Sequence, residues 1–306
     1  DGKIQLLNNY IYEKINFIFN LNKEELKFQE IKFAANKIIF FSDKVNIKRK
    51  EDIFYINGII KNKDAILSEN FLKLANFNFK NLKFDKTIFS SINNFNVEIN
   101  KNFKLKNIFF NSEIRLNNLI YNKDNYISDY FPKVNEEIIL KNHSLKLKYN
   151  KNLLSITGIG EIKLEENFNK IDYILEKNDQ DFKIQSNLTL DNINLKRHDF
   201  IGLFFPSSNE YINFKNQKLS IKYDNKKLSL TGESKIKIDD EFENIKYSIK
   251  KNGKKIDFDL NLDLKKTDFQ LNFINYKKNN KLNTKLKING SYELDKNLSL
   301  NNLIIL

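Results

Sequence analysis

The stretch Ile256-Asp257-Phe258-Asp259-Leu260-Asn261-Leu262-Asp263-Leu264 alternates strictly between apolar and polar residues. Successive side chains of a β-strand point to opposite faces, so this pattern predicts a strand with one dry face and one wet face. The same alternation recurs along most of the 306 residues, and helical periodicity is almost absent. The sequence therefore predicts an all-β fold, built as an elongated, mostly antiparallel and repetitive sheet.

Clusters of Asn, Asp and Lys separate the apolar runs. The chain has only eight Gly and two Pro, and Asn replaces them at turns because it tolerates a left-handed backbone better than other non-glycine residues. Residues 122–130 and 196–204 are predicted to form short helices, each ending shortly before a Pro. Strands thus account for nearly all of the expected structure.

An internal duplication is the strongest signal in the chain. Phe131-Pro132 recurs as Phe205-Pro206, and from there residues 131–190 align without a gap with residues 205–264, at an offset of 74 residues. Identical pairs occupy 24 of the 60 aligned positions, mostly on the apolar face. The duplicated unit is predicted to be a short meander of strands that stacks on its neighbour. We assign residues 1–125 to an N-terminal part of the sheet and 126–306 to a C-terminal part that contains both copies.

Four glycines occupy one equivalent place in similar segments, just after Asn or Thr: Gly58, Gly158, Gly232 and Gly290. An Asn-Gly pair often marks a hairpin turn. Alternation continues past each glycine, however, which favours a bend or bulge inside a strand.

The apolar face must be covered by something, and the expected helices are too few to cover it. An ordinary sandwich with a filled core is one solution. The alternative is a curled, incompletely closed sheet whose apolar groove holds a ligand, and the 27 Phe residues and scarce Gly favour it. The residues predicted to line the groove are Leu145, Leu147, Tyr149, Leu154, Ile156, Ile162, Leu219, Ile221, Tyr223, Leu228, Leu230, Ile236, Ile256, Phe258, Leu260 and Leu262.

Catalytic and metal-binding signatures are missing from the sequence. The chain has no Cys, and its two histidines, His143 and His198, are far apart among polar neighbours. The acidic stretches Glu165-Glu166 and 239–241 occupy the same repeat position, where a solvated turn is a better explanation than a calcium site. We therefore predict no enzyme activity, no metal site and no cofactor.

The formal net charge of +13 raises the possibility of a polyanion partner. The basic residues are spread among acidic ones along the whole chain, which favours a solubilising role, so no nucleic-acid partner is expected. Three functions stay open on the residues alone: a lipid-binding groove, a structural or partner-binding β-scaffold, and a basic polyanion binder.

The long meander of one-face-apolar strands, the Asn/Thr-Gly segments, and the aromatic-Pro sites Tyr130-Phe131-Pro132 and Phe204-Phe205-Pro206 together resemble the AsmA-like superfamily. Within it, the pattern is most similar to the YhdP- and TamB-like bridge-forming lipid transfer proteins, although the Trp common at the aromatic-Pro site is absent here. The resemblance covers most of the chain, and residues 126–306 best.

The resemblance implies a bacterial envelope protein with a periplasmic β-groove that conducts phospholipid between the inner and outer membranes. Acyl chains would occupy the groove, and basic residues such as Lys48, Arg49, Lys148 and Lys222 would attract headgroups at its slit. Since the chain starts at Asp1 and contains no Met, it is expected to be a segment of a longer protein, tethered to the inner membrane by an anchor outside these residues and able to contact other envelope proteins.

Overall fold

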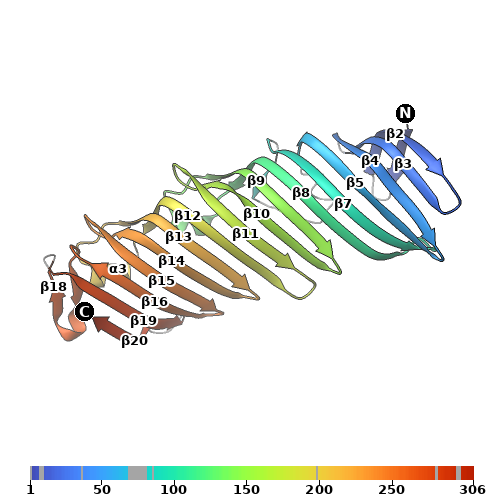
Figure 1. The fold of residues 1–306 in the computed structure, drawn as a ribbon. Helices are drawn as coiled ribbons and strands as arrows, with labels where there is room; N and C mark the ends of the chain where they lie inside the picture. The colour runs from blue at the N-terminus through green and yellow to red at the C-terminus, as the bar shows by residue number, and fades with distance from the viewer. Residues whose placement is uncertain are drawn as a thin grey trace. The chain divides into compact units, whose positions relative to one another are not determined.

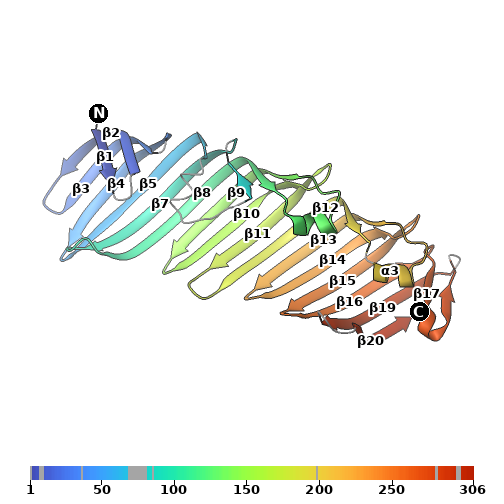
Figure 2. The same cartoon turned by 180° about the vertical axis from the view of Figure 1, so that it is seen from behind.

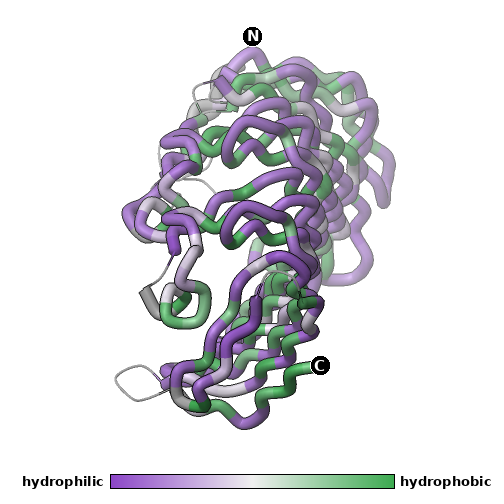
Figure 3. Tube along the Cα trace, turned by 90° about the vertical axis from the view of Figure 1, so that its left-hand side faces the viewer, coloured by the Kyte–Doolittle hydropathy of each residue, from purple (hydrophilic) through white to green (hydrophobic). Residues whose placement is uncertain are grey.

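The computed structural model confirms the all-β prediction: 75% of the chain is strand and 4% helix, in one antiparallel sheet that is not closed into a barrel. It describes residues 2–6, 10–35, 37–67, 81–84, 86–197, 199–279, 282–293 and 298–306. Consecutive strands pair with each other, so the chain runs as a repetitive meander (Figure 1). Hydrophilic and hydrophobic residues alternate along the strands (Figure 3), as the sequence pattern requires.

The chain divides into two compact units. Unit 1 comprises Asp1–Tyr121, Ile139–Gly160 and Ile174–Gln180, and unit 2 comprises Asn122–Ile138, Glu161–Tyr173 and Asp181–Leu306. Residues of three strands are divided between the units: β9 (Glu137–Asn150), β10 (Leu153–Lys163) and β11 (Phe168–Lys177). Each unit is therefore described separately.

Unit 1 is a meander of long strands. Its elements are β1 (Gly2–Leu6), β2 (Tyr10–Leu21), β3 (Glu25–Ala35), β4 (Ile38–Lys50), β5 (Ile53–Ile66), β6 (Leu82–Lys83), β7 (Ile88–Asn100) and β8 (Leu105–Asn122). β5 pairs directly with β7, and the short β6 pairs with the far end of β8. A core cluster forms on one face around Ile38, Phe40, Leu67, Phe84 and Phe89.

Unit 2 is also a meander, with short helices at its crossovers. Its elements are α2 (Asn125–Tyr130), β12 (Phe182–Lys196), α3 (Asp199–Phe204), β13 (Tyr211–Asp224), β14 (Lys227–Lys237), β15 (Phe242–Asn252), β16 (Lys255–Leu264), β17 (Phe269–Leu271), the 3₁₀ turn η1 (Asn272–Ile274), β18 (Tyr276–Lys278), β19 (Thr284–Glu293) and β20 (Leu298–Ile305). β17 and β18 form a separate two-stranded hairpin. The helix α3 lies beside β17 (Figure 2), where the Gln270 side chain donates a hydrogen bond to the Leu203 carbonyl.

The two short helices begin three residues later than the sequence predicted. Asn122 still belongs to β8 and Lys196 to β12, because strand pairing continues up to each crossover. The Asp124 side chain caps α2 by accepting a hydrogen bond from the Ile127 amide at 3.0 Å. Neither helix exceeds six residues, and no helix in the described part of the chain is long and apolar enough to cross a bilayer.

The secondary structure repeats at the same 74-residue offset as the sequence. α2 and α3, β9 and β13, and β10 and β14 have bounds that differ by that offset. Hydrogen bonds repeat as well: the Asn135 amide donates to the Leu164 carbonyl and the Asn209 amide to the Ile238 carbonyl, both at 2.8 Å. In each copy this Asn fixes the chain after the helix against the loop that follows the second strand of the meander.

The acidic turns have a structural role that the sequence did not reveal. The Glu165 carboxylate accepts hydrogen bonds from the Asn194 amide at 2.9 Å and from its side chain at 2.8 Å. Asp239, the equivalent residue in the second copy, accepts from the Thr267 hydroxyl at 3.2 Å. The prediction of a purely solvated turn was therefore incomplete, because the first acidic turn also fixes the last part of β12 and the second fixes the loop that follows β16.

Candidate functional site

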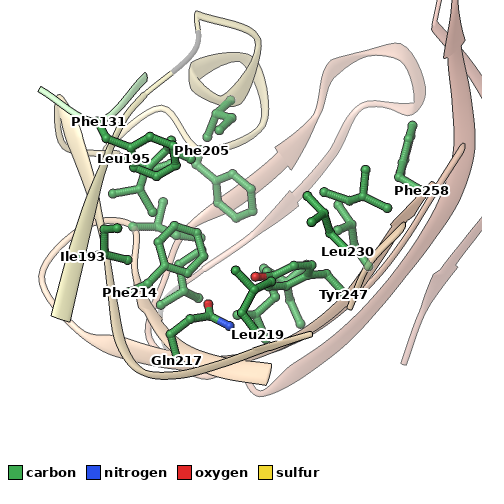
Figure 4. Close-up of a pocket in the computed structure, with 18 of the residues that line it drawn as sticks. Phe131, Ile193, Leu195, Phe205, Phe214, Gln217, Leu219, Leu230, Tyr247 and Phe258 are labelled. Atoms are coloured by element: carbon green, nitrogen blue, oxygen red, sulfur yellow. The ribbon is translucent and has the colours of Figure 1, made fainter. Parts of the chain in front are cut away.

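An apolar trough occupies the concave face of unit 2. Its hollow has a volume of about 640 Å³ and is partly open to solvent. Side chains on two facing walls point toward each other across it (Figure 4): Phe131, Leu195 and Phe205 on one side, Leu230 and Phe258 on the other. This volume lies within the range of about 300–1,000 Å³ that is usual for small-molecule sites.

The floor of the trough is built from rows of cross-strand neighbours. One row runs through successive strands β12 to β20 as Leu188, Leu219, Gly232, Tyr247, Leu260, Ile288 and Leu303. The next row begins outside the hollow at Ile221 and continues through Leu230, Ile249, Phe258, Gly290 and Leu300. Because directly paired residues share a face of the sheet, alternation within each strand becomes continuous apolar rows across strands.

The helices α2 and α3 contribute to one wall. Ile127 of α2 and Ile201 and Phe204 of α3 line the hollow, together with the Phe of each Phe-Pro pair. The two helices are too short to cover the apolar face, as expected, but the sequence did not predict that they would form part of a wall. The Phe-Pro pairs end each helix and direct an aromatic ring into the trough.

One end of the trough is filled. Phe269 and Leu271 of β17 are buried, and they pack with Leu264, Leu286 and Ile238 in the main core cluster of unit 2. Phe269 stacks on Phe204 at 6.4 Å between ring centroids. Unit 2 therefore combines a sandwich-like core at this end with a hollow over the remaining rows.

The loop before β17 is fixed by a buried carboxylate. Glu243 is 3% exposed, and one of its oxygens accepts hydrogen bonds from the amides of Lys265, Lys266 and Thr267 at 2.8, 2.6 and 3.2 Å. The buried Lys278 ammonium donates to the Thr267 carbonyl at 2.8 Å, and burial lowers its pKa. These contacts fix the segment that closes the filled end.

Polar atoms enter the trough at one place. Gln217 is 3% exposed, and its side-chain nitrogen donates to the Lys218 carbonyl at 2.8 Å. Burial raises the pKa of the neighbouring Tyr247 phenol, and a hydrogen bond with Gln217 acts in the opposite direction. Among the described lining residues these two side chains alone carry polar groups, so the trough has little to offer a charged or highly polar ligand.

A β-bulge places Gln217 in the trough. The pairing of β13 with β14 shifts register between Lys215 and Lys218, and Asn216 has a left-handed backbone with φ of 53°. The extra residue reverses the alternation, so Phe214 and Leu219 face the same side although they are five residues apart. Gln217 was not among the residues predicted from the sequence, yet this odd spacing of two apolar residues was a usable signal.

Six of the sixteen residues predicted to line a groove line this trough: Leu219, Leu230, Ile236, Phe258, Leu260 and Leu262. Ile162, Ile221, Tyr223, Leu228 and Ile256 belong to unit 2 and are half-buried but do not line the hollow. Leu145, Leu147, Tyr149, Leu154 and Ile156 lie half-buried on β9 and β10 in unit 1. Lys251 belongs to the same cross-strand row as Tyr223, Leu228 and Ile256. Because this row contains a charged side chain, it forms the edge of the trough and not its floor.

The four predicted glycines all lie inside strands rather than at hairpin turns: Gly58 in β5, Gly158 in β10, Gly232 in β14 and Gly290 in β19. Their backbones are not left-handed, since Gly253 alone among the described glycines has a positive φ. A bulge in the β19–β20 pairing begins at Gly290, between Asn289 and Gly290. At Gly232 the Tyr247 ring leaves no room for a side chain. At Gly290 the Ser299 carbonyl and the Phe258 ring do so together, and at Gly58 the Val45 side chain and the Phe95 ring lie close.

Of the two histidines, the structure describes His143. His143 is buried at 4% exposure in unit 1, and its ring lies against Gly160, where a Cβ on the glycine would be 2.5 Å from the ring Cδ2. His198 lies outside the described residues. Within the described part of the chain, no group of three or more His, Asp or Glu side chains could hold a metal ion.

The opposite face of unit 2 carries a polar hollow of about 710 Å³. Five lysines line it: Lys218, Lys235, Lys246, Lys285 and Lys287. Two acidic residues, Glu233 and Asp263, lie among them, and Glu233 pairs with Lys218 at 2.9 Å and with Lys246 at 3.7 Å. The apolar trough and this basic hollow are therefore on opposite sides of the same strands.

Comparison with known proteins does not place the chain: no family model, no curated protein and no solved structure matches it. The similarity to the AsmA-like superfamily thus stays a prediction from the sequence pattern.

Proposed function

We propose that this protein binds the acyl chains of phospholipids in the apolar trough of unit 2 and conducts them along it without catalysis. The observation that carries the proposal is the lining of the trough: continuous rows of aliphatic and aromatic side chains surround about 640 Å³ of open space, with polar groups at Gln217 and Tyr247 only among the described residues. Such a surface selects a ligand by its length and its apolar character and not by its polar functional groups.

Acyl chains suit this surface physically. They require only burial, which contributes ~0.8 kcal/mol for each methylene removed from water. A rigid polar ligand would leave its hydrogen-bonding groups unpaired against Leu, Ile and Phe, at a cost of about 1–3 kcal/mol for each group. The trough is also partly open to solvent, so a headgroup can stay in water while the chains lie inside.

The wider setting belongs to the same proposal. A bacterial envelope protein that stands in the periplasm, anchored in the inner membrane by a segment outside these residues, would use such a trough to pass phospholipid between the two membranes. The supporting observations are the open antiparallel sheet and the repeated Phe-Pro elements whose rings line the trough.

The test is mass spectrometry of organic extracts from the protein purified without detergent, followed by photo-crosslinking with a phospholipid that carries a diazirine in its acyl chain. We expect phospholipid in the extract and crosslinks to residues of the trough. An extract free of lipid, together with crosslinking no stronger than to a denatured sample, would contradict the proposal.

A second candidate rests on the basic hollow of unit 2. Five lysines against two acidic residues give it a net positive charge, which would attract a polyanion. Binding of this kind falls steeply with salt, whereas burial of acyl chains does not. Tight, strongly salt-dependent binding of heparin by a lipid-free protein would favour this function over the first.

A further inference from the structure

Three hairpin turns of unit 1 form a continuous edge, which we call the tip row. They are the β2–β3 turn at residues 22–24, the β4–β5 turn at 51–52 and the β7–β8 turn at 101–104. The Arg49 amide donates to the Glu24 carbonyl at 3.2 Å, which joins the first turn to the second. The Lys101 amide donates to the Asp52 carbonyl at 2.9 Å, which joins the second turn to the third.

Large apolar side chains project from this edge into solvent. Phe103 is 83% exposed, Leu21 is 73% exposed and Leu105 is 59% exposed. By strand spacing of about 4.8 Å, Leu21 and Phe103 lie roughly 20 Å apart along the edge, so together they present an extended apolar margin. Single exposed apolar residues are ordinary on a protein surface, but three at the first and third turns of one edge, on either side of the polar β4–β5 turn, are not.

The structure holds Phe103 in this position. Its backbone is left-handed with φ of 57°, a conformation that aromatic residues rarely adopt. The Asn100 side chain fixes the turn by accepting hydrogen bonds from the amides of Asn102 and Lys104. The Phe103 ring stacks on Phe54 at 6.3 Å and 7°, and the Arg49 guanidinium lies over the Phe54 ring at 5.8 Å.

Basic residues surround the apolar ones. Residues 22–25, 48–52 and 100–106 contain seven Lys or Arg against four Asp or Glu, a net charge of +3. Two of the acidic residues are engaged in ion pairs, Asp52 with Lys101 at 2.8 Å and Glu25 with Lys27 at 3.0 Å. Apolar side chains beside an excess of cations are complementary to a membrane interface that has anionic headgroups.

Unit 2 provides an internal contrast. Its β13–β14 turn is Asn225-Lys226 and its β15–β16 turn is Gly253-Lys254, and all four residues are exposed. These two turns contain only polar or small residues, as solvent-exposed turns usually do. The apolar side chains of the tip row are therefore not needed to make a turn in this sheet.

We propose that the tip row is a docking surface for a lipid bilayer with anionic headgroups. Phe103, Leu21 and Leu105 enter the interfacial region, while Lys23, Arg49, Lys101 and Lys104 contact headgroup phosphates. This proposal concerns an edge of unit 1 and goes beyond the lipid trough of unit 2.

The test uses the absence of Trp from the chain. Phe103→Trp introduces a single fluorophore into the full chain at the tip row, and Leu282→Trp introduces one at a 57% exposed apolar position of unit 2. With phosphatidylcholine vesicles that contain phosphatidylglycerol, we expect a blue shift and quenching by brominated acyl chains for Phe103→Trp alone. Pure phosphatidylcholine vesicles, or salt of about 1 M that shortens the Debye length to ~3 Å, should weaken both signals.

Removing the apolar groups tests the same surface by vesicle sedimentation. Asn accepts a left-handed backbone, so Phe103→Asn removes the ring without straining the turn. We expect Phe103→Asn with Leu21→Asn to weaken binding to anionic vesicles by about tenfold or more. Leu282→Asn, which lies outside both the tip row and the trough lining, should leave binding unchanged. The double variant should also keep its crosslinking to diazirine phospholipid in the trough, which separates this proposal from the proposed function.

Three results would overturn the proposal. One is an emission of Phe103→Trp that anionic vesicles do not change. Another is vesicle binding that the double variant retains in full. The third is a blue shift that appears without vesicles and grows with protein concentration, because the tip row would then be a contact between protein molecules.

Discussion

The ring of Tyr247 covers Gly232 on the neighbouring strand. The two residues are direct cross-strand partners, and a Cβ at Gly232 would lie 2.5 Å from the ring Cζ of Tyr247. The same relationship recurs between Gly290 and Phe258, at 2.9 Å to the ring Cζ, and between Gly58 and Phe95, at 3.0 Å. At Gly232 glycine is required because the aromatic ring occupies the space above it. At Gly290 the Ser299 carbonyl lies closer than the ring, and at Gly58 the Val45 side chain lies closer, so the ring is one of two obstacles at these places.

Replacing Gly232 by Ala should therefore destabilise the protein. The added methyl would overlap the Tyr247 ring and force it to move, at a cost of about 1–3 kcal/mol in the free energy of unfolding. Urea unfolding followed by far-UV circular dichroism measures this change. Combining Gly232→Ala with Tyr247→Ala should cost less than the sum of the single changes, because the overlap is then absent.

Gly202→Ala is the matched control. A Cβ at this position would lie 3.6 Å from the nearest atom, on Arg197, which is an ordinary contact, and the residue is in α3. Ala is a better helix former than Gly by roughly 0.5–1 kcal/mol, so this variant should be as stable as the parent or slightly more stable. Equal losses at Gly202 and Gly232 would contradict the covering-ring explanation.

Glu243 should be essential for the filled end of the trough. In Glu243→Ala three amides lose their acceptor, and that of Thr267 is buried, so we expect the free energy of unfolding to fall by about 1–3 kcal/mol. The amides of Lys265, Lys266 and Thr267 should lose protection in hydrogen exchange. Glu241→Ala is the comparison: this exposed carboxylate pairs with Lys266 at 2.8 Å, and its loss should destabilise the protein far less than the loss of Glu243.

The sheet was predictable because alternation is a local signal. The stretch from Ile256 to Leu264 became β16, and the Phe-Pro pairs do follow the two short helices. The sequence could not show how far along each strand the apolar residues line the hollow. Tyr223 and Leu228 have the same parity as residues of the trough, but their row also contains Lys251 from β15, and this pairing is a long-range property.

Bulges limited the prediction of the site in the same way. Period-two reasoning assumes an unbroken strand, and a single extra residue such as Asn216 exchanges the two faces beyond it. Gln217 enters the trough for that reason. The role of the helices was missed because their six residues are too few to show an amphipathic stripe.

Tyr173 should titrate unusually late. Burial raises its pKa to about 12, while an ordinary tyrosine has a pKa near 10. Folding thus favours the neutral phenol. Its contribution to stability is complete below pH ~10 and is lost as the pH rises toward 12, because the unfolded chain releases the proton first.

Replacing Tyr173 by Phe removes this effect. The fall in stability between pH ~10 and 12 should become shallower, and one late step should disappear from the absorbance titration of the 13 tyrosines. Tyr130→Phe, at a 49% exposed position, is the control and should leave the late absorbance step and the alkaline fall in stability in place. An unchanged alkaline profile in Tyr173→Phe would show that the buried phenol lies elsewhere.

A single charge in the trough should stop lipid binding. Leu230 lines the hollow, and Glu at this position would place a carboxylate beside Ile221 and Ile249, its direct cross-strand partners. An unpaired charge is expensive to bury, but the trough is partly open, so the new side chain can reach water while the sheet keeps its pairing. We expect the fold to survive and the crosslinking to diazirine phospholipid to fall by at least about tenfold.

The adjacent residue supplies the control. Thr231 is exposed on the opposite face of β14, so Thr231→Glu adds the same charge to the same strand outside the trough and should leave crosslinking intact. The two candidate functions, a lipid trough and a filled scaffold core, predict different results for Leu230→Glu. In a filled core Leu230→Glu would unfold the domain, and the parent protein would capture no lipid. Thermal stability and crosslinking, measured on both variants and the parent, therefore distinguish the two functions.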